Sequence, residues 1–239
     1  MQQHEWYYQQ NKSEYNFVSN FTQAKKILEV GCGEGHFHSV SNCDDYVGLE
    51  FNTKAVEKCK AKNLTVFKQS IEDFAKENSN SFDVVCSFQV LEHVTNPIEF
   101  LQYSINSLKI GGYLIISVPA EDSFVGLTQN NILNAPPHHL TRWTDRSFSY
   151  LADKLDLELV QIHHEPLDQI HERWFASFLG QQIINRIFKK GLTKLFDDSI
   201  FDKLMRKSGS LLGLFLEIGI KNHNKLFVGH TVTVIYKKL

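Results

Sequence analysis

The chain has 239 residues, of which 42% are hydrophobic and 22% charged, a composition typical of a globular protein that can bury a sizeable core. The formal net charge of -2 excludes the global positive field with which many nucleic-acid-binding proteins attract their ligand. The four cysteines are Cys32, Cys43, Cys59 and Cys86, and they form no CxxC pair and no spacing typical of metal ligands. This pattern favours a protein of the reducing cytoplasm.

Short apolar segments alternate with polar segments of helical spacing from about residue 26 onward. The apolar segments lie at residues 27–30, 45–50, 64–67, 82–87 and 113–118. Helical spacing is clearest at 53–62 and 97–108, where Pro97 suits a first helical turn and Gly111-Gly112 closes the end. Continuous apolar strands that alternate with helices predict a parallel sheet covered on both faces.

The alternation changes after Pro119. Residues 120–147 predict a long loop with a short helix near 123–133, and such loops usually carry function. A helix at 145–155, a strand at 157–163, a mainly helical stretch at 167–222 and a β-branched strand at 231–236 follow. We therefore predict one domain over 1–239, divided into an N-terminal cap (1–24), a cofactor-binding core (25–165), a helical insert (166–225) and the last strand (226–239).

Three glycines, Gly31, Gly33 and Gly35, follow the first predicted strand and precede a helical stretch. Glycines here let the backbone turn sharply and approach a ligand without a Cβ in the way. The dinucleotide-binding fingerprint needs a further glycine three positions after its second one, and His36 stands there instead. A cofactor loop and a purely structural glycine turn both remain open at this point.

An acidic residue, Glu50, ends the second predicted strand. A carboxylate there can accept hydrogen bonds from both hydroxyls of a ribose, although a solvated glutamate at a strand end is the alternative. Two further segments follow: Ser70-Ile71-Glu72-Asp73 comes just after the third strand, and residues 81–94 contain the fourth strand and the turn after it.

The order of these motifs resembles that of the class I S-adenosylmethionine-dependent methyltransferases. The likeness rests on a V-G-C-G-x-G loop, an F-D-x-V strand and an L-E-H-V segment, and it covers roughly residues 25–165. It implies an enzyme of class EC 2.1.1.- that uses S-adenosyl-L-methionine and releases S-adenosyl-L-homocysteine. It also implies a three-layer α/β/α doubly wound fold, with a mostly parallel seven-stranded sheet, an antiparallel last strand and a helical insert before that strand.

The resemblance assigns roles to individual residues. The backbone of the glycine loop would hold the methionine portion, Glu50 the ribose, and Phe51 and Ser70–Glu72 the adenine, while residues 87–89 would lie near the ammonium and sulfonium groups. The cofactor-binding residues implied in this way are Glu29, Gly31, Cys32, Gly33, Gly35, Glu50, Phe51, Ser70, Ile71, Glu72, Ser87, Phe88 and Gln89.

Metal dependence is not expected. The ubiquinone-biosynthesis O-methyltransferases of the same class often have an acidic residue three places before the Glu-His pair and are thought to use a divalent metal. Here Gln89 occupies that place, and a neutral amide is a poor ligand for a hard cation. We therefore interpret Glu92-His93 as structural.

The substrate side is expected in residues 135–144, which resemble the P-P-H-H-L-x-x-[WF]-[TS] stretch of a broad set of bacterial methyltransferases of the same class. Many of these are encoded with cell-surface glycan or small-metabolite pathways. His138 and His139 are candidates for a general base that deprotonates a hydroxyl, and the alternative is that a histidine only holds the loop. Arg142 has a substrate anion or Glu121 and Asp122 as alternative partners.

The functional prediction is a cytoplasmic methyltransferase that acts on a hydroxyl, with an amine second, of a small molecule or glycan precursor. The alternatives are a catalytically silent cofactor-binding protein of the same fold and an NAD-type oxidoreductase. No nucleic-acid partner, signal peptide or transmembrane segment is expected. For the insert, a lid, a homodimer surface and a peripheral membrane contact remain open.

Overall fold

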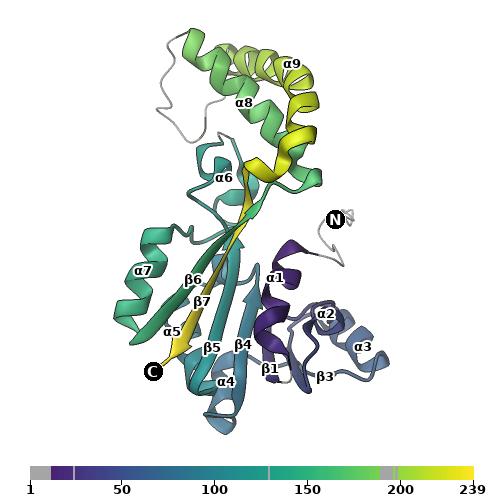
Figure 1. Ribbon diagram of the computed structural model, residues 1–239, viewed down its shortest axis with the longest axis vertical. Helices are drawn as coiled ribbons and strands as arrows, with labels where there is room; N and C mark the ends of the chain where they lie inside the picture. The colour runs from purple at the N-terminus through teal and green to yellow at the C-terminus, as the bar shows by residue number, and fades with distance from the viewer. Residues whose placement is uncertain (1–11, 24, 129, 189–195, 197–198) are drawn as a thin grey trace. The chain divides into compact units, whose positions relative to one another are not determined.

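The computed structural model of the protein describes residues 12–23, 25–128, 130–188, 196 and 199–239. Their strands form one seven-stranded sheet in the order β3-β2-β1-β4-β5-β7-β6, in which β7 runs antiparallel (Figure 1). The strands are β1 (Lys26–Val30), β2 (Asp45–Leu49), β3 (Thr65–Phe67), β4 (Phe82–Phe88), β5 (Leu108–Pro119), β6 (Leu157–Pro166) and β7 (Val228–Lys238). This order, with helices flanking the sheet, confirms the predicted doubly wound fold and its antiparallel last strand.

Helices connect the strands in the order that the sequence pattern predicts. The α-helices are α1 (Ser13–Thr22), α2 (His38–Ser41), α3 (Thr53–Ala61), α4 (Ile71–Glu77), α5 (Pro97–Ser107), α6 (Phe124–Leu127), α7 (Asp145–Lys154), α8 (Glu172–Ile187) and α9 (Ile200–His223). Short 3-10 turns are η2 (Leu91–His93), η3 (Ile132–Asn134), η4 (Gln169–His171) and η5 (Asn224–Leu226). Pro97 lies in the first turn of α5, as predicted.

The expected role of Gly111 and Gly112 is wrong. Helix α5 ends at Ser107, and both glycines lie inside β5, which begins at Leu108. Gly111 has a φ of +79°, and a Cβ on Gly112 would lie 2.9 Å from the Asp83 carbonyl oxygen. The two glycines therefore lie at an irregularity of the β4–β5 pairing, where the register shifts between Phe82 and Val84 and residues with a Cβ would fit poorly.

The described residues form two compact units. The first takes its residues from 1–118, 145–163 and 233–239, and the second from 119–144 and 164–232. The division into cap, core, insert and last strand stays a prediction. No helix in the described ranges is long and apolar enough to cross a membrane.

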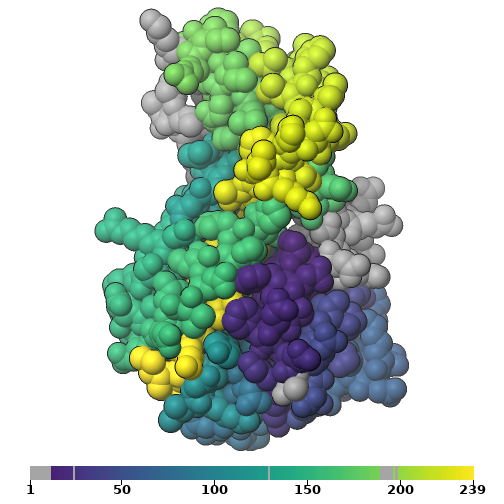
Figure 2. All heavy atoms as spheres, viewed as in Figure 1, coloured from purple at the N-terminus to yellow at the C-terminus, as the bar shows by residue number. Residues whose placement is uncertain are grey.

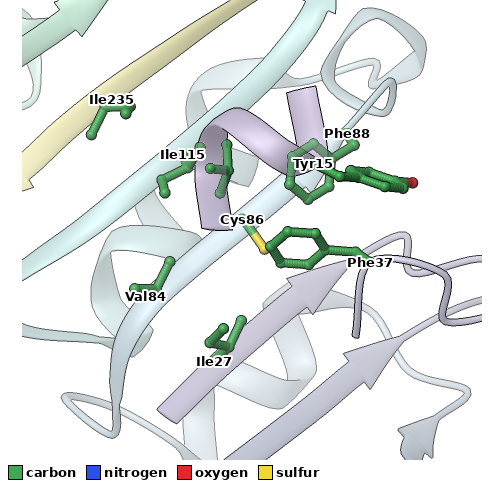
Figure 3. Close-up of a cluster of buried hydrophobic side chains, with 9 residues drawn as sticks. Tyr15, Ile27, Phe37, Val84, Cys86, Phe88, Ile115 and Ile235 are labelled. Atoms are coloured by element: carbon green, nitrogen blue, oxygen red, sulfur yellow. The ribbon is translucent and has the colours of Figure 1, made fainter. Parts of the chain in front are cut away.

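The core of the first unit is built around three aromatic rings (Figure 3). The Tyr15 ring from α1 lies 4.9 Å from Phe88 at the end of β4, and Phe37 contacts both, with centroids 5.3 Å from Tyr15 and 4.7 Å from Phe88. Ile27 and Cys86 are completely buried beside them. This packing joins α1, the residue before α2 and the middle of the sheet, and so it fixes the chain that follows the glycine loop.

The second unit is organised by a close crossing of α8 and α9, which lie side by side in Figure 1. A Cβ on Gly180 would lie 2.1 Å from the Gly209 carbonyl oxygen, and one on Gly213 would lie 2.8 Å from the Ala176 oxygen. The backbones approach this closely only because both helices present glycine at the crossing.

We predict that Gly180→Ala lowers the free energy of unfolding by about 1–3 kcal/mol, because the added methyl group must separate the helices. Gly219→Ala is the matched control, since a Cβ there meets no described atom within 4 Å. It should raise stability by up to about 1 kcal/mol through helix propensity. Urea denaturation followed by circular dichroism measures both, and equal stabilisation by the two substitutions would contradict the crossing.

Candidate functional site

The glycine loop leaves β1 in a backbone conformation that other residues rarely adopt. Gly31, Gly33 and Gly35 have φ angles of +79°, +53° and +74°. The Gly31 and Cys32 N–H groups donate to the Leu49 carbonyl oxygen at 2.8 and 3.0 Å, so the loop is attached to the end of β2. A Cβ on Gly31 would lie only 2.4 Å from Val90 Cγ2. Position 31 therefore requires glycine for two reasons: its φ angle is positive, and a side chain there would clash with Val90.

The Glu50 carboxylate lies between the glycine loop and the start of α3. Its Oε2 accepts a hydrogen bond from the Gly33 N–H at 2.9 Å, and its Oε1 accepts one from the Asn52 N–H at 2.8 Å. These bonds fix the orientation of the carboxylate. Each carboxylate oxygen can accept more than one hydrogen bond, so the group has capacity left for a diol such as that of a ribose.

A cavity of about 390 Å³ opens at the carboxyl ends of β1 and β2. Its position is the point where the strand order reverses around β1, which is where ligands bind in open α/β sheets. It brings together six of the residues that the sequence assigns to the cofactor, namely Gly31, Glu50, Phe51, Ser70, Ile71 and Glu72. A large exposed aromatic ring, Phe51, and the buried Ile71 offer apolar surfaces for an adenine ring.

Sequence reasoning missed one wall of the cavity. This wall comes from the segment after β4 and from the first turns of α5, and its residues are Val90, Val94, Thr95, Asn96, Glu99, Phe100 and Tyr103. Asn96, Glu99, Phe100 and Tyr103 have the spacing of a single helix face, so the sequence carries a signal for a common surface. It carries none for the contact of that surface with the glycine-loop side, which depends on how α5 packs.

The remaining residues of the predicted set do not line this cavity. Glu29 and Cys32 are buried, and the Tyr46 hydroxyl donates a hydrogen bond to Glu29. Phe88 belongs to the aromatic core, and the Gln89 N–H donates to the Ser117 carbonyl oxygen at 2.8 Å. Ser87 Oγ is buried and has no hydrogen-bond partner among the described residues. An orphaned hydroxyl at the end of β4 is consistent with a polar ligand group there.

Two buried glutamates have strongly shifted acidities. Burial raises the pKa of Glu29 to about 8, although the hydrogen bond from Tyr46 opposes the shift. Burial also raises the pKa of Glu92 to about 8. Below pH 8 both side chains are mainly protonated, so neither places a full negative charge beside the glycine loop.

In the second unit, a chain of polar contacts holds the loop that carries the two histidines. Arg142 Nη1 donates to Glu121 Oε1 at 3.0 Å, and Asn134 Nδ2 donates to Glu121 Oε2 at 3.2 Å. Asn134 Oδ1 lies 3.0 Å from His139 Nδ1. His139 is buried, and its ring stacks on that of the half-buried His138 with centroids 4.9 Å apart. Of the alternatives for Arg142, the structure therefore shows the pairing with Glu121.

These contacts favour one tautomer of His139. A carboxylate only accepts hydrogen bonds, so Glu121 turns the amide NH₂ of Asn134 toward itself and the amide oxygen toward His139. An amide oxygen also only accepts, so His139 Nδ1 carries a proton. In the neutral ring the lone pair is then on Nε2, the form in which a histidine can act as a base through that atom.

Comparison with known proteins identifies the family. A family model described as "Methyltransferase domain" matches residues 3–162, which is more than half of the chain. The chain belongs to the methyltransferase-domain family. The match spans the glycine loop, Glu50 and the cavity, and it excludes the NAD-type oxidoreductase as an interpretation of the glycines.

Two relatives and one solved structure show how far the likeness extends. A mitochondrial ubiquinone biosynthesis O-methyltransferase of Dictyostelium discoideum is 35% identical over 109 residues, which are 38% of this chain and 34% of that protein. A probable S-adenosylmethionine-dependent methyltransferase of Mycobacterium tuberculosis is 23% identical over 189 residues, 76% of this chain and 68% of that protein. The crystal structure of a SAM-dependent methyltransferase from Archaeoglobus fulgidus matches with a TM-score of 0.58 at 18% identity, covering 93% of this chain and 90% of that one.

The methyltransferase domain of this chain is of the S-adenosylmethionine-dependent class, EC 2.1.1.-, and its methyl donor is S-adenosylmethionine. The match to the Dictyostelium protein spans only about a third of that protein's length. Its likeness therefore does not identify the acceptor.

We predict that Glu50→Gln weakens binding of S-adenosylhomocysteine about 10- to 100-fold, because hydrogen bonds to a charged acceptor are worth about 1.5–3 kcal/mol. Isothermal titration calorimetry measures the dissociation constant. Glu57→Gln, an exposed substitution on α3 outside the cavity, is the control and should bind like the parent. Equal affinity of Glu50→Gln and the parent would refute the ribose assignment.

We also predict that Glu29 contributes stability that is lost as pH rises from about 5 to 8. Over this range folded Glu29, with its pKa raised to about 8, keeps a proton that the unfolded chain loses, so deprotonation favours unfolding. Glu29→Gln cannot ionise and still accepts from the Tyr46 hydroxyl, so this variant should lose part of the slope. Urea denaturation across the range tests this, with Glu57→Gln as control. An unchanged slope in Glu29→Gln would contradict the shifted acidity.

Proposed function

We propose that the protein is a methyltransferase that transfers the methyl group of S-adenosylmethionine to a hydroxyl oxygen of a small molecule or glycan precursor. The observation that carries the donor side is the Glu50 carboxylate, held by Gly33 and Asn52 at the edge of the cavity. The oxygen acceptor is supported by the likeness to a ubiquinone biosynthesis O-methyltransferase and by the tautomer of His139.

The proposed cofactor contacts come from two groups of residues: those that line the cavity, and those of the glycine loop and the end of β4. Glu50 binds the ribose, and Phe51 with Ser70, Ile71 and Glu72 surrounds the adenine. The backbone from Glu29 through Gly31, Cys32, Gly33 and Gly35 holds the methionine portion. Ser87, Phe88 and Gln89 at the end of β4 complete this portion of the site, where the orphaned Ser87 hydroxyl has hydrogen-bonding capacity to offer.

His139 is the proposed general base. When bound, S-adenosylmethionine supplies an electrophilic methyl group on a sulfonium centre, and the acceptor oxygen displaces the sulfur. His139 Nε2 takes the proton of the acceptor hydroxyl, so that the oxygen attacks with increased negative charge. Asn134 and Glu121 are positioning residues, because they act only by holding the His139 ring in the reactive tautomer. His138 supports the ring by stacking.

The acceptor class is tested by incubating the protein with S-adenosylmethionine labelled in its methyl group and a panel of phenols, catechols, sugars and amines. Mass spectrometry of the products locates the label. We expect a methyl ether. Methylation confined to amines would refute the oxygen acceptor. Tight cofactor binding with no methyl transfer to any acceptor class would favour a catalytically silent protein of this fold. The cytoplasmic location is a separate prediction that this assay does not test.

We predict that His139→Gln lowers kcat about 10²- to 10⁴-fold, the usual contribution of a general base. Asn134→Asp keeps an acceptor for His139 Nδ1, whereas Asn134→Leu removes it. The Leu variant should therefore lose more activity than the Asp variant, and its pH–rate profile should change. S-adenosylhomocysteine affinity is the folding control. Activity of His139→Gln equal to that of the parent, or equal profiles of the two Asn134 variants, would refute these roles.

A further inference from the structure

Helix α9 has apolar residues on both of its sides: Met205 and Ile220 are buried, and seven large apolar side chains are exposed. The side that packs within the second unit includes Asp202, Gly209 and Gly213, and both glycines lie against α8. The opposite side carries large exposed apolar side chains, which are Ile200, Phe201, Leu204, Leu211, Leu214, Phe215 and Ile218. We call these seven residues the outward face of α9. Figure 2 shows α9, in yellow-green to yellow, at the surface of the protein.

The outward face follows one side of the helix and is interrupted at its middle by Lys207 and Ser208. Leu204, Leu211 and Ile218 are seven residues apart and so lie along one line of the helix surface, with Phe215 beside them. Phe215 is 72% exposed and Ile218 is 69% exposed. A surface helix of a globular protein normally has polar and charged residues on the side that faces away from the core. Exposed apolar side chains gathered on that side indicate a partner that covers them.

The charge on and around the outward face indicates what the partner is. Lys203 lies at one edge of the outward face and Lys207 lies within it, on the helix line of Ile200 and Leu214; both lysines are exposed. The two acidic residues of α9 are not available to a partner: Asp202 is buried and paired with Arg206, and Glu217 is paired with Arg173 and Lys221. Residues 166–225 hold ten Lys and Arg against six Asp and Glu, whereas the whole chain holds 25 against 27. The insert is therefore basic on an otherwise acidic protein.

We propose that the outward face of α9 binds an anionic lipid surface. The apolar side chains enter the boundary between headgroups and acyl chains, while Lys203 and Lys207 extend their long side chains to the lipid phosphates. In this proposal the helix lies on the lipid surface and does not cross the bilayer, since no described helix is long and apolar enough to do so.

A second copy of the chain fits this face less well. In a two-fold interface the face would meet itself, so the two lysines would need an acidic complement on the same surface. The outward face carries no carboxylate, and the acids nearest to it on α9 are already buried or paired. An anionic bilayer supplies both the apolar layer and the negative charge.

Flotation of the full-length protein with lipid vesicles tests the proposal. The parent should float with vesicles of phosphatidylcholine and phosphatidylglycerol, and much less with phosphatidylcholine alone or at high salt. Phe215→Gln/Ile218→Gln should weaken binding at least about tenfold through lost apolar burial. Lys203→Glu/Lys207→Glu should weaken binding to the anionic vesicles by about tenfold or more.

Matched substitutions elsewhere separate this face from a general effect. Ile110→Gln removes an equally exposed apolar side chain, and Lys60→Glu/Lys154→Glu reverses two exposed charges; both variants should bind vesicles like the parent. S-adenosylhomocysteine affinity, unchanged in all variants, reports the fold and keeps this test separate from the proposed methyl transfer. Absence of parent binding, or equal binding by all variants, overturns the proposal. A parent dimer that Phe215→Gln/Ile218→Gln converts to a monomer, without vesicle binding, would instead assign the face to a second copy.

Discussion

The hydrogen bond between the Gly33 N–H and the Glu50 carboxylate joins the glycine loop to the first residue after β2. It forms because the loop turns through positive φ angles and so points a backbone N–H toward the next strand. The same carboxylate also holds the start of α3 through Asn52. Both elements beside the cavity are therefore held by one carboxylate at the end of β2, and Gly31 and Val90, which also line the cavity, approach too closely to admit a Cβ on Gly31.

The two units use glycine for different purposes. In the first unit, glycine gives the backbone a turn that brings N–H groups to a carboxylate. In the second unit, Gly180 and Gly209 let two helices cross at backbone distance, and the exposed apolar side chains of α9 lie on the side of the helix away from this crossing. The proposed cofactor site depends on the glycines of the first unit, and the helix with the proposed lipid-binding face packs through the glycines of the second.

The sequence predicts the fold well where the signal is local. Apolar strands ending in glycine or an acidic residue, with helices between them, predict the sheet and place Glu50 at the edge where the cavity lies. The sequence fails where the outcome depends on packing. Gly111 and Gly112 have the spacing of a helix end but lie in β5, and the α5 wall of the cavity is invisible without the contact between α5 and the loop. Likewise, the apolar residues of α9 are evident from the sequence, but which of them are buried and which exposed depends on how α9 packs on α8.

The central claim is that the cavity beside Glu50 holds the adenosyl portion of the cofactor. A crystal structure of the protein with S-adenosylhomocysteine tests it most directly. The account predicts both ribose hydroxyls within hydrogen-bond distance of the Glu50 carboxylate, and the adenine between Phe51 and Ile71. A ligand bound elsewhere, or a ribose that does not contact Glu50, would contradict it.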